Sequence, residues 1–127
     1  MVAEISFQDD KLKIDRMVCA IDCGLVINPD GVKAQIESGI AIGLSAALFG
    51  EITFDDGQVE QSNFNNYKII RMDQMPIIET HIVPSYEAPT GAGEPPVPPT
   101  APALTNAIFS GTGIRYRSLP LKEVVLV

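Results

Sequence analysis

The sequence has little cysteine and no run of basic residues, and each absence excludes a class of protein. Cys19 and Cys23 are its only cysteines in 127 residues, too few for a disulfide framework, a second metal-binding pair or a four-cysteine iron–sulfur cluster. Nine basic against sixteen acidic residues give a net charge of −7. This balance argues against non-specific nucleic-acid binding and against attachment to an anionic membrane surface.

The sequence also lacks signals for export or membrane insertion. Residues 1–5 have neither the basic head nor the apolar core of a signal peptide. The longest run of low polarity, residues 39–50, is too short to cross a bilayer. Cys19 and Cys23 lie in a segment that alternates like a strand, so we expect buried structural thiols in a reducing cytoplasm. Periplasmic targeting of a longer parent or of a partner stays open.

Composition and local patterns predict one globular domain over residues 1–127. The hydrophobic fraction is 46% and the charged fraction 20%, values typical of soluble globular proteins with a core. Residues 3–7 and 11–14 flank a polar turn at residues 8–10, which indicates a β-hairpin, and an apolar run follows at residues 16–22.

Two later segments also predict strands. Asp55-Asp56-Gly57 lies between two short runs, a strong hairpin signal. Residues 77–83 alternate between two faces, as a strand does.

A long helix is predicted from Asn28 onward. Asn28 suits the N-cap, Pro29 the first helical position, and Asp30 complements the helix dipole. The helix should run to about Phe49, with Gly50 as its stop. Its apolar stripe consists of Val32, Ile36, Ile40, Gly43 and Ala47.

The same helix contains many small residues, and isolated glycines cost helix stability. Their presence indicates close approach of another backbone or of a ligand, and tight packing on a sheet explains most of them. A shorter helix is predicted over residues 101–111, ending in glycine. Runs of strands with two inserted helices predict an α+β fold: a two-layer sandwich in which one long and one shorter helix cover a mainly antiparallel, twisted sheet.

Residues 90–99 form a loop rich in glycine and proline around one carboxylate, Glu94. Glycine permits positive φ or close approach to a ligand, and proline pushes the residue before it toward extended backbone. A carboxylate on such a stiff support is suited to act as a general base, which must lie at fixed reach from one proton. A proline-rich surface turn with an incidental glutamate is the alternative.

Two motifs resemble conserved blocks of the molybdenum hydroxylases, the xanthine dehydrogenase and aldehyde oxidase family. The first block is Cys-Ala-Ile-Asp-Cys-Gly at 19–24, Val-Ile-Asn-Pro at 26–29 and Ala-Gln-Ile-Glu-Ser-Gly at 34–39. The second is Gly-Ala-Gly-Glu-Pro-Pro at 91–96, followed by Ala-Pro-Ala at 101–103 and Asn-Ala-Ile at 106–108. The resemblance is nearest to the beta subunit of the isoquinoline 1-oxidoreductase type, and two long motifs in order make it specific.

The resemblance implies a function for two residues. Members of the family hydroxylate N-heterocycles or aldehydes with oxygen from water, at a molybdenum held by a pterin that is often a cytosine dinucleotide in bacteria. Glu94 matches the glutamate that acts as general base toward the metal-bound hydroxide. Gln35 matches the glutamine that contacts the pterin, since an amide offers both a donor and an acceptor. By spacing alone, Gln35 faces either solvent or a cofactor.

Other polar residues have plainer interpretations. Glu37 is expected to be a solvated helix charge, and His81 a surface or partly buried strand residue, since no second ligand clusters with it. The sequence therefore predicts no metal ligand in this chain. A pyrophosphate-bearing cofactor needs donors or positive charge, and an acidic chain of this size has few.

Family members have a much longer molybdenum-binding polypeptide, so the resemblance implies that this chain is its C-terminal part. The partners are then the rest of that subunit and an iron–sulfur subunit, and the substrate is a heterocycle or an aldehyde. We expect the chain alone to fold but neither to hold cofactor nor to turn over. The alternative is a non-catalytic interaction domain, a remnant whose exposed former interface drives self-association or partner binding.

Overall fold

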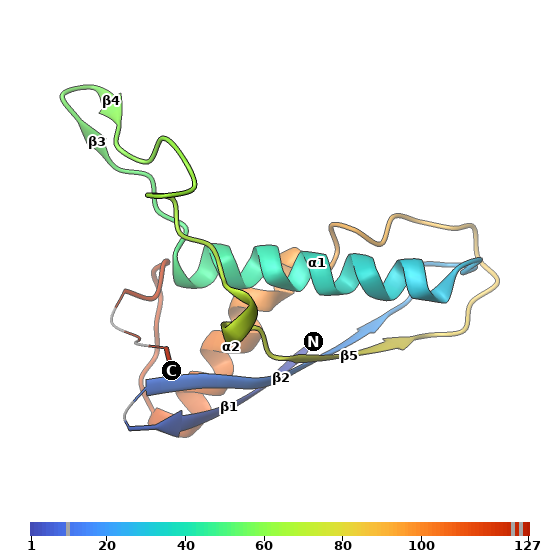
Figure 1. Cartoon of the computed structure of the whole chain (residues 1–127). Helices are drawn as coiled ribbons and strands as arrows, with labels where there is room; N and C mark the ends of the chain where they lie inside the picture. Colours follow the sequence, from blue (N-terminus) through green and yellow to red (C-terminus); the bar gives the residue numbers. More distant parts are fainter. Residues whose placement is uncertain (10, 123, 125) are drawn as a thin grey trace.

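The computed structural model describes residues 1–9, 11–122, 124 and 126–127 (Figure 1). Asp10, the last residue of the first predicted turn, lies outside the described residues. The elements, in chain order, are β1 (Val2–Gln8), β2 (Lys11–Ile21), α1 (Pro29–Leu48), β3 (Phe54–Asp55), β4 (Gln58–Val59), the 3₁₀ turn η1 (Met72–Gln74), β5 (Ile77–Ile82) and α2 (Val97–Thr112).

The fold is α+β, as predicted, with one sheet layer and one helix layer. The main sheet has the order β1-β2-β5, and both helices lie on the same face, α2 against β1 and α1 against β5 (Figure 1). β1 and β2 are antiparallel, whereas β5 pairs in parallel with β2. The sheet is therefore mixed: β5 is reached through a crossover that contains α1, and such a connection permits parallel pairing.

β2 joins the two strands that the sequence predicted separately. The register with β1 shifts between Glu4 and Ile5, which is the signature of a bulge. Leu12 and Ile14 are buried before the shift, and Met17 and Cys19 after it. The buried positions are even-numbered before the shift and odd-numbered after it, and the bulge lets both sets of side chains face the core.

The long helix begins as predicted. The Asn28 side chain accepts hydrogen bonds from the backbone N–H groups of Asp30 and Gly31, each at 3.2 Å. The helix ends at Leu48, and the Phe49 and Gly50 amides both donate to the Ser45 carbonyl oxygen. One face of α1 supplies much of the core, namely Ile36, Gly39, Ile40, Gly43, Leu44, Ala47 and Leu48.

The second helix begins earlier than predicted. It starts at Val97, so that Pro98 and Pro99 lie in its first turn, where the missing proline N–H would have no helical acceptor. It ends at Thr112 rather than at Gly111, because Gly113 adopts a left-handed conformation with φ 74° and caps it. The proline-rich segment that resembled a loop is thus partly helical.

The second hairpin lies at the tip of an arm, residues 49–71, that projects beyond the C-terminal end of α1 (Figure 1). Asp56 and Gly57 both have positive φ, 45° and 76°, as a tight type I′ turn requires. β3 and β4 form their own two-stranded sheet. No helix of the described residues is both long and apolar enough to span a membrane.

Candidate functional site

The two motifs that stood out in the sequence are in contact in the structure. The Thr90 amide donates to the Cys23 carbonyl oxygen at 2.9 Å, and the Leu25 amide donates to the Glu87 carbonyl oxygen at 3.0 Å. Gly24 lies between these bonds with φ 74°, and a Cβ built there would come within 2.3 Å of the Ala88 carbonyl oxygen. The close approach of two backbones therefore requires glycine at this position.

The other end of the loop is held by α1. A Cβ on Gly39 would lie 2.3 Å from Pro96 Cγ and 3.0 Å from the Gly93 carbonyl oxygen. One turn further, a Cβ on Gly43 would lie 2.7 Å from Thr100 Cβ. Gly39 and Gly43 of α1 thus admit the loop and the first turn of α2, whereas the sequence analysis assigned most of the small residues to packing on the sheet.

Hydrogen bonds stiffen this end of the loop. The Val97 amide donates to the Glu94 carbonyl oxygen at 2.9 Å, and the fully buried Thr100 hydroxyl donates to the Pro96 carbonyl oxygen at 2.7 Å. Glu94 therefore belongs to a backbone turn that leads directly into α2. Its side chain is exposed.

Gln35 lies beside this turn. A Cβ on Gly93 would be 2.8 Å from Gln35 Oε1, so the amide lies against the backbone of the residue next to Glu94. Gln35 is exposed, which agrees both with a solvated helix residue and with a residue that faces a cofactor. The structure brings the two candidate residues to one open surface formed by α1 and the loop. Glu37, one turn along α1 from Lys33, is exposed too.

His81 is an exposed residue of β5 whose Nε2 lies 2.6 Å from Glu79 Oε1. Glu79 also accepts from Arg16 Nη1 at 2.6 Å, and Arg16 in turn pairs with Glu4 at 2.6 Å. The His81 and Arg16 side chains lower the pKa of the Glu79 carboxyl, and Arg16 lowers that of Glu4. Glu79 and His81 are neighbours on one strand, but the sequence did not reveal the link to Arg16 and Glu4, because it depends on strand pairing.

Cys19 and Cys23 are buried free thiols, as predicted, and burial raises the pKa of Cys19. Within the described residues, no group of three or more His, Cys, Asp or Glu side chains is placed to hold a metal ion.

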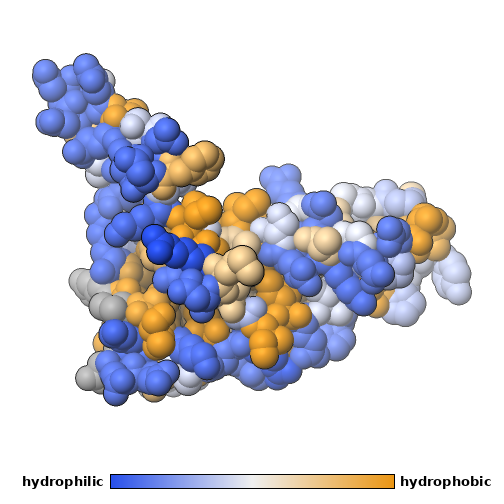
Figure 2. Space-filling model, in the orientation of Figure 1, coloured by the Kyte–Doolittle hydropathy of each residue, from blue (hydrophilic) through white to orange (hydrophobic). Residues whose placement is uncertain are grey.

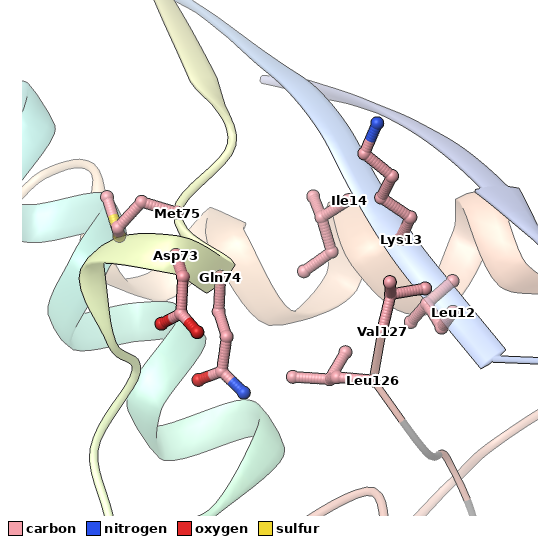
Figure 3. Close-up of a pocket in the computed structure, with 8 residues that line it drawn as sticks. All are labelled: Leu12, Lys13, Ile14, Asp73, Gln74, Met75, Leu126 and Val127. Atoms are coloured by element: carbon pink, nitrogen blue, oxygen red, sulfur yellow. The ribbon is translucent and has the colours of Figure 1, made fainter. Parts of the chain in front are cut away.

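A small cavity of about 90 Å³ lies at the start of β2 (Figure 3). Its lining combines β2, the η1 turn with the residue after it, and the last residues of the chain: Leu12, Lys13, Ile14, Asp73, Gln74, Met75, Leu126 and Val127. The Val127 amide donates to the Leu12 carbonyl oxygen at 3.0 Å. Neither Gln35 nor Glu94 lines this space, so we interpret it as a packing gap.

Comparison with known proteins identifies a family, a relative and two solved structures to which this chain is similar. The molybdopterin cofactor-binding domain family matches residues 1–76, which include Gln35 but not Glu94. Isoquinoline 1-oxidoreductase subunit beta of Brevundimonas diminuta is 39% identical over 127 residues, covering 98% of this chain and 16% of the relative.

Two solved structures share the fold. Aldehyde oxidoreductase from Desulfovibrio desulfuricans superposes with a TM-score of 0.79 at 28% identity, over 94% of this chain and 14% of that one. Quinoline 2-oxidoreductase from Pseudomonas putida 86 has a TM-score of 0.82 at 22% identity, over 94% of this chain and 17% of that one. The chain thus spans between 14% and 17% of the length of these three proteins.

Proposed function

Because the chain belongs to the molybdopterin cofactor-binding domain family of the xanthine dehydrogenase and aldehyde oxidase type of enzyme, we propose that it forms the base-bearing part of a molybdenum hydroxylase. The observation that carries this proposal is the contact between Gln35 and Gly93. This contact brings the Gln35 amide beside the turn that carries Glu94, and both side chains are exposed.

The residues present fit the edge of a pterin. The Gln35 amide offers two donors and an acceptor, and its neighbour Gly93 has no side chain to obstruct a flat ring. A Cβ on Gly91 would meet nothing within 4 Å, so the loop leaves space in front of it. Neither residues 34–39 nor residues 91–96 contain a Lys or Arg. The donors for a dinucleotide pyrophosphate must then come from elsewhere in the enzyme.

The proposed chemistry assigns one task to each residue. When bound, the molybdenum–pterin group supplies the two-electron redox chemistry of hydroxylation. Glu94 accepts the proton of the water-derived oxygen nucleophile at a carboxylate oxygen, as a general base must from a fixed distance. Gln35 holds the pterin edge, and the close packing of Gly39 on Pro96 fixes the turn from which Glu94 projects.

The wider proposal concerns the complete enzyme. Residues 1–127 act as one domain, the C-terminal part of a molybdenum-binding subunit, and work with the rest of that subunit and an iron–sulfur subunit. The substrate is an N-heterocycle or an aldehyde, supported by the names of the relative and of the solved structure at 28% identity. The proposal also includes the cytosine dinucleotide form of the cofactor. It includes a cytoplasmic location as well, with which the two free thiols agree.

A non-catalytic interaction domain is the second candidate function. The observation that favours it is the number of large hydrophobic side chains exposed on the arm, such as Phe54 and Phe64. A neighbouring reading frame that encodes the missing molybdenum-binding portion would favour the enzyme. A stable homo-oligomer with no such neighbour would favour the interaction domain.

The decisive experiment replaces Glu94 by Gln in the assembled enzyme. Loss of the base should lower kcat by about 10²- to 10⁴-fold while leaving the circular dichroism spectrum and the molybdenum content unchanged, because the side chain is exposed. Glu37→Gln is the matched control: the same change at an exposed helix residue should leave turnover as in the wild type. Turnover that survives Glu94→Gln would remove Glu94 from the mechanism.

A further inference from the structure

The arm, residues 49–71, exposes several large apolar side chains. Its exposed large side chains are Ile52, Phe54, Val59, Phe64, Tyr67 and Ile69, with Phe64 at 93%. Single exposed hydrophobic residues need no explanation, but groups of them mark interaction sites. Phe54 and Val59 pair across the hairpin, and Tyr67 and Ile69 line one groove. The arm projects from the body rather than folding back on it (Figure 1).

The foot of the arm forms an apolar groove with α1. The Ser45 hydroxyl donates to the Ala41 carbonyl oxygen at 2.7 Å and accepts from the Ile70 amide at 3.1 Å, which fixes the arm to the helix. Beside this joint lies a groove of about 350 Å³ lined by Ser38, Ala41, Ile42, Ser45, Ala46, Tyr67, Ile69 and Ile70. Figure 2 shows hydrophobic atoms gathered where the arm meets α1. The lining contains no charged side chain.

The groove lies on the same side of α1 as Gln35. Gln35, Ser38, Ile42 and Ala46 are spaced three or four residues apart, so they follow one line along the exposed side of α1. The parallel line of Gly39 and Gly43 contacts the Glu94 turn and α2. Any surface that binds in the groove and extends along α1 therefore reaches Gln35 and comes next to Glu94.

We propose that the groove and the arm bind an apolar surface of the remaining molybdenum-binding polypeptide, and so close the site over Gln35. The inference rests on the proposed function and adds to it the surface through which this chain binds the remaining polypeptide. The chain spans only 14% to 17% of the proteins it resembles, so most of the polypeptide that would complete the site lies outside it. A second copy fits less well, since each copy has a net charge of −7 and the two would repel.

The test uses the isoquinoline 1-oxidoreductase beta subunit of Brevundimonas diminuta, deleted for the segment that matches this chain and co-expressed with this chain carrying an affinity tag. The wild-type chain should co-purify with the deleted subunit, and Ile42→Glu should weaken that binding at least about 30-fold, as loss of an interface hot spot does. Val2→Glu is the matched control, because Val2 is 60% exposed on β1 and Ile42 is 56% exposed. It should bind as the wild type does.

Hydrogen exchange gives a second measurement that needs no variant: residues 38–46 and 67–70 should become protected in the complex. Binding unaffected by Ile42→Glu, no complex with the wild-type chain, or a homodimer that Ile42→Glu dissociates would each overturn the proposed interface. The proposed function is judged separately, by turnover. A complex that forms through the groove but stays active with Glu94→Gln would contradict the role of Glu94 and leave the interface standing.

Discussion

Gly39 and Gly31 lie on the same helix but differ in what an added methyl group would meet. At Gly39 it would lie 2.3 Å from a ring carbon of Pro96, which cannot swing away, whereas at Gly31 its nearest neighbour is Asn28 Cγ at 3.6 Å. Overpacking at Gly39 should outweigh the helix propensity that alanine adds and destabilise the fold by about 1–2 kcal/mol. Gly31→Ala should stabilise it by up to about 1 kcal/mol.

Urea unfolding of both variants checks this pair of outcomes. Equal effects at the two positions would mean that the loop does not pack on α1 as closely as the structure has it. A Gly39→Ala enzyme should also lose turnover with little loss of substrate binding, because the substitution displaces the Glu94 turn rather than a substrate contact.

Gln35 allows the proposed cofactor contact to be tested apart from catalysis. Gln35→Met keeps the length of the side chain but removes its donors and acceptor. The lost hydrogen bonds should weaken pterin binding by about tenfold, while the exposed position leaves the stability of the domain unchanged. Molybdenum and released pterin, measured per mole of assembled enzyme, check this. Full occupancy of the variant would assign Gln35 to the solvated helix surface instead.

Arg16 ties the three strands of the main sheet together, since it lies on β2 and pairs with Glu4 of β1 and Glu79 of β5. The pKa of each carboxyl is lowered from 4.5. A lowered folded-state pKa stabilises the fold fully above the unfolded value, and this contribution is lost as the pH falls through the folded value. Stability should therefore decline below about pH 4.5.

Arg16→Met should remove part of this loss of stability at low pH. Lys11→Met, a change at an exposed position of the same strand, should leave it unchanged. The measurement is the urea midpoint of each protein between pH 6 and pH 3. Because the paired side chains are exposed, 1 M salt should shrink the difference between the two variants. A pH dependence that Arg16→Met leaves intact would show that other carboxyl groups control acid unfolding.

Elements with local signals were predictable from the sequence, and those that depend on distant pairing were not. Asn28 and Pro29 mark the start of α1 through bonds within four residues, and Asp56-Gly57 specifies its turn by backbone conformation alone. The parallel pairing of β5 with β2 depends on a crossover of more than fifty residues. The early start of α2 was missed because prolines usually mark loops, although a first helical turn tolerates them.

The candidate site shows the same division. The stiff loop around Glu94 and the small residues of α1 were evident in the sequence, and in the fold Pro96 packs on Gly39 and Thr100 on Gly43. The position of Gln35 beside Gly93 joins residues far apart in the chain, and spacing along a helix could not choose between solvent and a cofactor.

The molecule as a whole presents its candidate base and amide on an open surface, and this predicts how these 127 residues behave alone. A cofactor binds tightly when most of its surface is enclosed by convergent polar groups, whereas Gln35 and Glu94 are both exposed and no Lys or Arg lies in either motif segment. The purified 127-residue protein should fold cooperatively yet contain well under one molybdenum per chain. Co-expression with the rest of a molybdenum-binding subunit should raise the metal content of the complex toward one. Metal analysis of both preparations, with thermal unfolding as the check on folding, measures this directly. Stoichiometric molybdenum in the isolated chain would mean that α1 and the Glu94 loop enclose the pterin without help.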